Sequence, residues 1–256
     1  MKKIHLEHLA GIKDDEIYYK GDLSLLAKPR VSVVGSRKMS VYTKNLLSHL
    51  VSKLSSIGIC VVSGGAIGVD IWAAEHSYPN TIAVFANSLD TIYPKQNQVL
   101  IQNIYQNALA FSEHKDNKNP KKWDFLERNR IVVGLGEFLI IAQADLKSGS
   151  LNSANHAIKQ GKQIFVLPQR AGESDGTNEL LWQNKAKLIY DIDVFLEYVA
   201  NYFGLNQSQK DENDEILSFL KTPKTLDEMV GLFKDKVYEY ELMGLVRIDG
   251  VMVYRN

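Results

Sequence analysis

Short runs of apolar, mostly β-branched residues alternate with amphipathic stretches along most of the chain. The runs Val31–Val34 and Ile59–Val62 precede helical patterns at Val41–Leu54 and Val69–His76. Strands this uniformly apolar are typically buried on both faces, which predicts a parallel sheet covered by helices. We therefore predict an α/β fold with a doubly wound, mostly parallel Rossmann-like sheet over residues 29–205. The remaining predicted strands are Thr81–Phe85, Ala108–Phe111, Phe138–Ala142 and Gln163–Leu167.

The pattern changes after Leu205. Residues 206–213 are polar throughout and are predicted to be a linker. Residues 214–256 contain three short helical patterns and then two β runs that flank Asp249-Gly250, a strong hairpin signal. We predict a small winged-helix-like domain there, and an N-terminal extension over residues 1–28 before the first strand. The three helical patterns are Glu215–Leu220, Leu226–Phe233 and Lys236–Leu245.

The composition is ordinary for a globular protein, and no apolar run approaches the roughly 20 residues that span a bilayer. His5, Glu7 and His8 stand where a signal peptide would be apolar, so we predict no export signal and no membrane association. Cys60 is the single cysteine, which favours a reducing compartment and a cytoplasmic protein. The net charge is zero, so any nucleic-acid binding requires positive charge gathered in one groove.

Loops rich in glycine and serine follow several predicted strands. Gly35-Ser36-Arg37 follows the first, Ser63–Asp70 the second, and Gln143–Ser150 the fifth. In doubly wound sheets such loops meet at one edge, where glycine lets a backbone approach a ligand and helix N-termini attract anions. Arg37 adds a forked donor that suits phosphate oxygens. The alternative is that the glycines only form turns.

The loops match no complete cofactor or catalytic motif. Gly35-Ser36-Arg37-Lys38 lacks the dinucleotide fingerprint, and Ser63–Gly68 contains G-x-x-x-G only. A Walker A sequence and a Cys/His cluster with metal spacing are also missing from the sequence. We therefore predict no cofactor, no metal site, no catalytic residues and no enzymatic activity.

The segment Lys115–Arg130 carries six basic and three acidic residues in a neutral protein. Trp123 and Phe125 are interleaved with the basic residues. Cations that track a phosphate backbone, with aromatic rings on which bases stack, are the components of a single-strand binding site. The alternative is a solvated loop with two core aromatics.

Several segments, in order, resemble the DNA-processing protein A (DprA, or Smf) family over about residues 30–190. The resemblance implies an extended Rossmann fold that binds single-stranded DNA, a homodimer, and assistance in loading the RecA recombinase on DNA during natural transformation. The matching segments are Val33–Arg37, Val62–Asp70, Ser88–Pro94, Phe125–Arg130, Ser148–Ala154 and Gly176–Leu181.

The resemblance also implies roles for individual residues. Phosphates would be held by the first Gly-rich loop, with the second loop beside it, and Phe125 would lie against a base. Lys122 precedes the Phe-x-x-Arg-Asn-Arg motif, in which one arginine has a structural role. The implied DNA-binding residues are Gly35, Ser36, Arg37, Ser63, Gly64, Gly65, Lys122, Phe125, Arg128 and Arg130, with Lys147, Ser148, Gly149 and Arg170 as further candidates.

The chain departs from the family pattern at three points. Gly65 stands where the family often has Leu, and Asn152 where it often has Ile or Val. With fewer than 30 residues before the first predicted strand, we expect the N-terminal helical domain of many members to be absent.

The C-terminal segment resembles the winged helix of the family. From residue 211 it has ten acidic and six basic residues, a net charge of −4, which leaves +4 on residues 1–210. Because phosphate contacts supply most non-specific DNA affinity, this acidity favours a protein contact over a duplex-DNA reader.

Two other functions fit parts of the sequence. Rossmann-like nucleotide hydrolases resemble Ser63–Gly68, but the later motif that carries their catalytic Glu is replaced by Ser148–Ala154, which has no acid. A transcription regulator acting through the winged helix is the other alternative.

Overall fold

The computed structural model describes residues 2–5, 16–116, 119–205, 214–220, 222–242 and 245–255. The chain divides into two compact units, Met1–Tyr198 and Val199–Asn256. The predicted linker at 206–213 lies outside the described residues, as do residues 6–15 of the predicted N-terminal extension. Within the described residues, no helix is long and apolar enough to cross a membrane.

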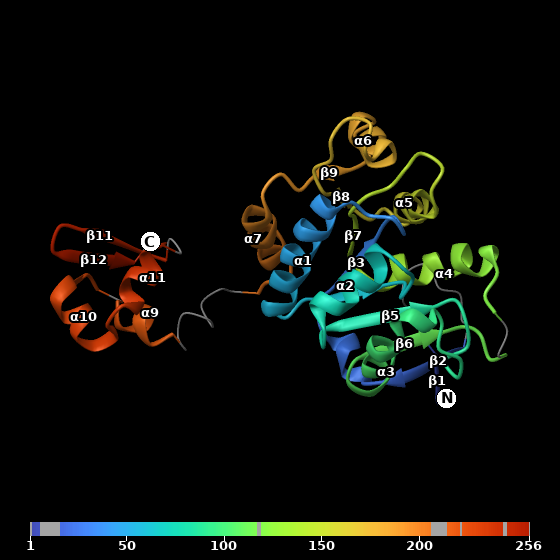
Figure 1. Cartoon of the computed structure of the whole chain (residues 1–256), viewed down its shortest axis with the longest axis horizontal. Coiled ribbons are helices and arrows are strands. Elements are labelled where there is room, and N and C mark those ends of the chain that lie inside the picture. Colours follow the sequence, from blue (N-terminus) through green and yellow to red (C-terminus); the bar gives the residue numbers. More distant parts are fainter. Residues whose placement is uncertain are drawn as a thin grey trace. The chain divides into compact units, whose positions relative to one another are not determined.

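In the part of the chain that the structure describes, the first unit is built on a nine-stranded sheet with the order β1-β2-β6-β5-β4-β3-β7-β8-β9 (Figure 1). The strands from β6 to β9 are parallel, so the predicted doubly wound, mostly parallel α/β fold is confirmed. The strands are β1 Lys2–His5, β2 Glu16–Gly21, β3 Arg30–Val34, β4 Cys60–Ser63, β5 Thr81–Phe85, β6 Leu109–Ser112, β7 Phe138–Ile141, β8 Ile164–Val166 and β9 Lys187–Leu188.

The expectation that the sheet begins after residue 29 is wrong. Strands β1 and β2 pair with each other and β2 pairs with β6, both antiparallel, so they extend the sheet at one end. They lack the apolar run that marks the other strands, because an end of the sheet buries little surface. Ile17 is buried in β2, but Tyr18, Tyr19 and Lys20 are only half-buried. Strand β9 has two residues, too short for a pattern.

Helices cover both faces of the sheet (Figure 1). Helix α1 packs beside α2, and α4 packs beside α5. The Ser32 hydroxyl of β3 donates to the Val132 carbonyl of α4 at 2.5 Å, and right-handed crossovers place α1 on the other side. Helices α1, α2, α4 and α5 follow β3, β4, β6 and β7 through loops, so their N-termini gather at the carboxyl edge of the sheet. The helices are α1 Val41–Ser56, α2 Val69–Ser77, α3 Gln98–Asn107, α4 Lys122–Leu135, α5 Gly149–Lys159, α6 Asp175–Trp182 and α7 Ile192–Tyr202, with 3-10 turns at Leu23–Ala27 and Lys95–Asn97.

The second unit contains a small antiparallel sheet of order β10-β12-β11 over a core that includes Met229, Val237 and Val253. The predicted hairpin is present, with Asp249 paired to Met252 and Gly250 in the left-handed region. Strand β10 adds a pairing that the sequence did not predict, and the winged-helix assignment stays a prediction. The elements are α9 Glu215–Phe219, β10 Lys224–Thr225, α10 Leu226–Phe233, α11 Lys236–Leu242, β11 Val246–Asp249 and β12 Met252–Arg255.

Gly21 ends β2 with φ of +99°, and a Cβ atom there would lie 1.9 Å from the Ala108 carbonyl oxygen. Gly21→Ala should therefore lower the free energy of unfolding of the first unit by about 3 kcal/mol, from left-handed strain and a backbone clash together. Gly161→Ala is the matched control, because Gly161 has φ of +66° but open space around it. That variant should lose only about 1 kcal/mol. Urea unfolding followed by tryptophan fluorescence measures both, since all three tryptophans lie in the first unit. Equal losses would contradict the proposed clash.

Candidate nucleic-acid interface

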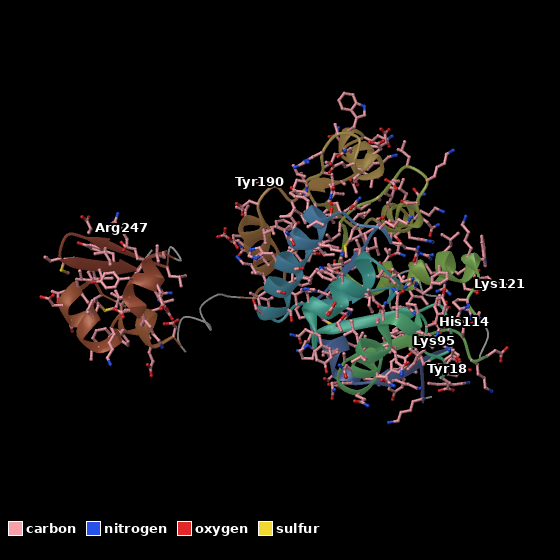
Figure 2. All side chains as sticks on the ribbon, viewed as in Figure 1. Tyr18, Lys95, His114, Lys121, Tyr190 and Arg247 are labelled. Atoms are coloured by element: carbon pink, nitrogen blue, oxygen red, sulfur yellow. The ribbon has the colours of Figure 1, made fainter. Side chains whose placement is uncertain are left out.

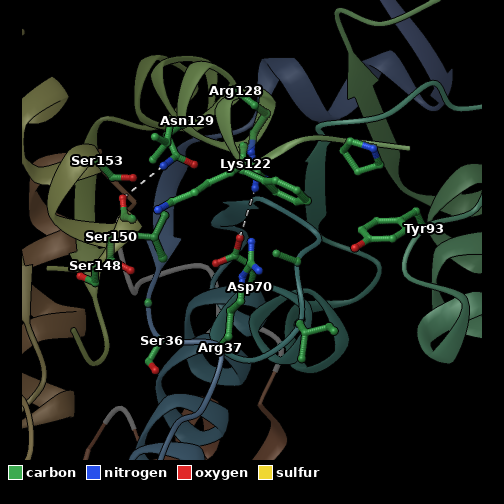
Figure 3. A pocket seen from close by; sticks show the side chains of 18 residues that line it. Ser36, Arg37, Asp70, Tyr93, Lys122, Arg128, Asn129, Ser148, Ser150 and Ser153 are labelled. Carbon is green, nitrogen blue, oxygen red and sulfur yellow. Dashed lines mark hydrogen bonds and ion pairs between the residues drawn. The ribbon is translucent and has the colours of Figure 1, made fainter. Parts of the chain in front are cut away.

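A cavity of about 570 Å³ lies at the carboxyl edge of the sheet, where the strand order reverses beside β3. Such a reversal opens a crevice between loops that leave the sheet in opposite directions, and ligands of doubly wound folds bind there. Figure 3 shows side chains of α4, α5 and the β3–α1 loop converging on it. Eight of the residues expected to bind DNA line this cavity: Gly35, Ser36, Arg37, Lys122, Phe125, Arg128, Ser148 and Gly149.

Two aromatic rings and a guanidinium form one wall of the cavity. The Arg37 guanidinium carbon lies 4.9 Å from the centre of the Phe125 ring, and the Tyr93 ring lies 6.4 Å from Phe125 at an interplanar angle of 52°. Tyr93 was not singled out from the sequence, although it lies in the Ser88–Pro94 motif. Together these groups present flat faces on which a planar ligand can stack.

Lys122 is the first residue of α4 and is exposed. The preceding Lys121 N–H donates to the Asp124 carboxylate at 2.7 Å, which caps the helix start. Asp124 is thus engaged by the backbone, and the Lys122 side chain points from α4 toward the side of the cavity that carries Ser150 (Figure 3). Trp123, the other aromatic of this segment, is 64% exposed and does not line the cavity.

The N-terminus of α5 forms the opposite wall. Ser148 is the N-cap, but its side chain makes no capping hydrogen bond. The hydroxyls of Ser148 and Ser153 are buried without a hydrogen-bond partner among the described residues. Unsatisfied hydroxyls and the first N–H groups of a helix supply hydrogen bonds and partial positive charge, a setting that suits a phosphate. Ser150 also lines this wall, and the Asn129 amide joins α4 to it by donating to the Gly149 carbonyl at 3.2 Å.

A buried ion pair forms the floor of the cavity. The Arg128 guanidinium lies 3.8 Å from the Asp70 carboxylate and donates to the Val84 carbonyl at 2.6 Å. Burial raises the pKa of the Asp70 carboxyl to about 6, opposed by Arg128, by the N–H groups of Ala66 and Gly64, and by Arg37. Burial also lowers the pKa of Arg128. Arg128 therefore lines the cavity, but its guanidinium is engaged by Asp70 and the Val84 carbonyl and has a structural role.

The second Gly-rich loop lies beneath the cavity. Ser63, Gly64 and Gly65 are buried, and the Ser63 hydroxyl donates to the Asp70 carbonyl at 2.7 Å. A Cβ on Gly64 would lie 1.8 Å from an Arg128 nitrogen, and Gly65 has φ of +63°. These three residues support the Asp70–Arg128 pair from below and do not themselves line the cavity.

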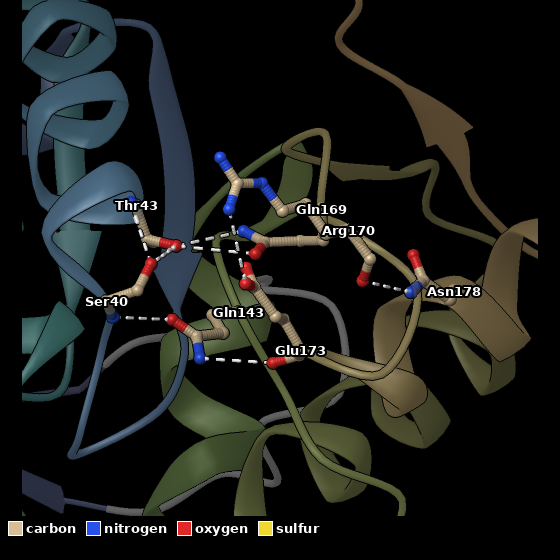
Figure 4. Close-up of polar contacts among 7 residues, drawn as sticks. All are labelled: Ser40, Thr43, Gln143, Gln169, Arg170, Glu173 and Asn178. Atoms are coloured by element: carbon tan, nitrogen blue, oxygen red, sulfur yellow. Dashed lines mark hydrogen bonds and ion pairs between the residues drawn. The ribbon is translucent and has the colours of Figure 1, made fainter.

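Three other candidates also lie outside the cavity lining. Arg130 forms an ion pair with Glu113. Lys147 is exposed in the loop before α5. Arg170 is exposed and its guanidinium lies 3.7 Å from Glu173 (Figure 4).

A polar network fixes the loops at this edge (Figure 4). The Gln143 side chain accepts from the Ser40 N–H at 2.9 Å, and its carbonyl accepts from the Ser36 N–H at 2.8 Å. The Gln169 amide donates to the Thr43 hydroxyl at 3.0 Å. The β3–α1 loop that carries Arg37 is thereby tied to the loop after β7.

Asp70 generates a pH prediction. Because its folded-state pKa of about 6 is above the ordinary value of 3.8, Asp70 contributes stability that is present below pH 3.8 and lost as pH rises through 6. The unfolding free energy of the wild type should thus fall relative to Asp70→Asn over this window, by up to about 1.4 kcal/mol per pH unit. Chemical denaturation at a series of pH values measures this difference. Asp145→Asn, at an exposed position on the same edge, controls for the loss of one carboxylate. Parallel curves for the wild type and Asp70→Asn would contradict the assignment.

Solved structures show the same architecture. The DNA processing protein A of Helicobacter pylori, described for its single-stranded DNA binding mode, superposes with a TM-score of 0.75 at 43% identity, over 78% of this chain and 95% of that one. The DprA structure from Streptococcus pneumoniae gives 0.71 at 34% identity, over 77% of this chain and 73% of that one.

Sequence comparison agrees with the structures. The DNA processing protein DprA of Bacillus subtilis is 37% identical over 156 residues, which are 59% of this chain and 52% of that protein. The chain thus spans about half the length of this curated relative. The family model of DNA recombination-mediator protein A matches residues 8–200, which contain the whole cavity. The chain therefore belongs to the DNA recombination-mediator protein A family.

Proposed function

We propose that this chain binds single-stranded DNA in the cavity at the carboxyl edge of its sheet. The observation that carries the proposal is the convergence of Arg37, Phe125 and Lys122 with the open N-terminus of α5 on one cavity. Cations and helix N–H groups suit phosphates, and exposed ring faces suit bases. The single-strand binding mode described for the Helicobacter pylori relative supports this reading.

The shape of the site favours an unpaired strand. A base stacks on Phe125 or Tyr93 only if its own face is free, and a duplex keeps its base faces stacked on each other. The phosphate of the same nucleotide would lie toward Ser148 and Lys122, on the opposite wall. Stacking is tolerant of base identity, so we expect little sequence preference.

In the cell, we propose that the bound strand is handed to the RecA recombinase during natural transformation, with a cytoplasmic homodimer as the working form. Membership of a recombination-mediator family supports this role. For the second unit we propose a protein contact, because residues 211–256 carry a net charge of −4 that opposes DNA phosphates.

We also propose that the cavity is not an enzyme active site. A buried carboxyl with a raised pKa, such as Asp70, is the kind of group that serves as a general base. Here both its burial and its partners have a structural explanation, since it accepts N–H groups from Gly64 and Ala66 and faces Arg128. The nucleotide-hydrolase alternative lacks a second acid at Ser148–Ala154.

Removing the cations tests the site. Arg37→Ala and Lys122→Ala should each weaken binding of a labelled single strand about tenfold at moderate salt. Each should also lower the slope of log affinity against log salt by about 0.7, the contribution of one neutralised phosphate. Fluorescence anisotropy at several salt concentrations measures both quantities.

Arg170→Ala is the matched control, because this arginine is exposed at the same edge but lies outside the cavity lining. It should bind within about twofold of the wild type. Wild-type affinity and salt slope in both Arg37→Ala and Lys122→Ala would overturn the proposed site.

The acidity of the second unit gives a separate prediction. A chain that ends at residue 205 should bind single strands at least as tightly as the whole chain, because it loses ten acidic and seven basic residues. The whole chain should bind a duplex of equal length much more weakly than a single strand. Titrations of both proteins with both forms of DNA provide the measurement. Loss of duplex binding on truncation would instead support a duplex reader in the second unit.

A further inference from the structure

The aromatic wall of the cavity continues outward along the sheet edge. Tyr93 is 38% exposed, contacts Phe125 on its inner side, and is followed by Pro94 and the exposed Lys95. The loop that carries Tyr93 is held at the carboxyl ends of β5 and β6, because the Asn87 carbonyl accepts from the Ser112 hydroxyl at 2.7 Å. Tyr93 therefore stands between the cavity and the end of the sheet formed by β2 and β1.

Strand β2 brings a second tyrosine to this edge. Tyr18 is paired with Ser112, the last residue of β6. Lys20, two residues away and so on the same face of β2, donates to the Leu89 carbonyl at 2.7 Å in the loop before Tyr93. Tyr18 thus faces the side of the sheet where the Tyr93 loop lies, one step nearer the carboxyl edge than Lys20.

Two lysines and a histidine flank these two rings. The Lys3 ammonium lies 5.4 Å from the centre of the Tyr18 ring, and the Lys95 side chain is exposed. His114 follows β6 and is held by its N–H, which donates to the Ser112 hydroxyl at 3.0 Å. Figure 2 shows Lys95, His114 and Tyr18 on the same side of the first unit as Lys121, at the start of α4. We call Tyr93, Lys95, His114, Tyr18 and Lys3 the outer path.

Two acidic residues close to the outer path, Asp90 and Glu113, form ion pairs. Asp90 lies 3.1 Å from the Lys20 ammonium, and Glu113 is paired with Arg130. The exposed Lys95 adds positive charge to the outer path, although the protein as a whole is neutral. Rings interleaved with cations along an edge suit a single strand whose bases are unpaired.

We propose that a single strand leaving the cavity past Tyr93 continues over the outer path, with bases stacked on Tyr93 and Tyr18 and phosphates near Lys95 and Lys3. This inference rests on the proposed function of the cavity and extends it to a longer binding site. It also assigns a role to β1 and β2, which contribute no residue to the cavity lining.

Strand length separates the two parts of the site. Oligodeoxythymidylates of about 4 and about 16 nucleotides are titrated into the full chain, because single-strand sites span about this range. Tyr18→Ala should weaken binding of the longer strand about tenfold through loss of one stacking ring, and leave the shorter strand within about twofold. Lys95→Ala should weaken the longer strand a few-fold and lower its salt slope by about 0.7.

Matched controls exclude general effects. Tyr18→Phe keeps the ring and should bind as the wild type does. Tyr190→Ala removes an exposed tyrosine after β9, at the other end of the sheet, and Lys159→Ala removes an exposed lysine at the end of α5. Both should leave the affinity for either strand unchanged. Thermal unfolding checks that Tyr18→Ala keeps its fold, and the exposed Lys95 gives a test that does not depend on it.

The outcomes are distinct. If Tyr18→Ala or Lys95→Ala binds the longer strand with wild-type affinity, the outer path is refuted, but the proposed site in the cavity is not. Equal weakening for both lengths also overturns it, because the residues would then act on the cavity or the fold. Failure of the wild type to bind either strand refutes the proposed function itself.

Discussion

The buried pair of Asp70 and Arg128 is the constraint on which the carboxyl edge of the sheet depends. Asp70 comes from α2 and Arg128 from α4, helices on opposite faces of the sheet, and the two meet beyond the ends of β4 and β5. A buried charge without a partner is very costly, so the two helices must keep this register. The same pair orders the loop below it, because Asp70 accepts N–H groups from Gly64 and Ala66.

The basic residues at this edge have two different roles, structural pairing and lining of the cavity. Arg128 is committed to Asp70 and to the Val84 carbonyl, and Arg130 to Glu113. Arg37 and Lys122 extend into the cavity, one over an aromatic ring and one from a helix start. A neutral protein can thus present positive charge at the cavity, because Asp70, Asp124 and Glu113 are engaged by Arg128, the Lys121 N–H and Arg130. In the same way, Asp90 close to the proposed outer path is paired with Lys20.

Much of the site could be predicted because its residues are contiguous in sequence and follow strands. The loop at Gly35–Arg37 and the start of α4 were identified by residue type and position. The sequence alone does not show whether Ser63–Gly65 line the cavity or support the buried pair beneath it. Glycine and serine are common in both kinds of loop. The sequence alone does not identify Tyr93 or Ser153, because neither stands out by residue type or position. Only the fold places Tyr93 beside Phe125 and the Ser153 hydroxyl near the N-terminus of α5.

The sequence by itself determined the doubly wound sheet, since uniformly apolar strands can be buried only between two layers of helices. It also determined which edge carries the chemistry, because Gly-rich loops follow the strands and lead into helices. Only the tertiary structure decided that β1 and β2 join the sheet, because polar strands at its end leave no apolar run to detect. It also decided which arginine faces the cavity and which is buried, because that depends on carboxylates far away in the chain, such as Asp70 for Arg128.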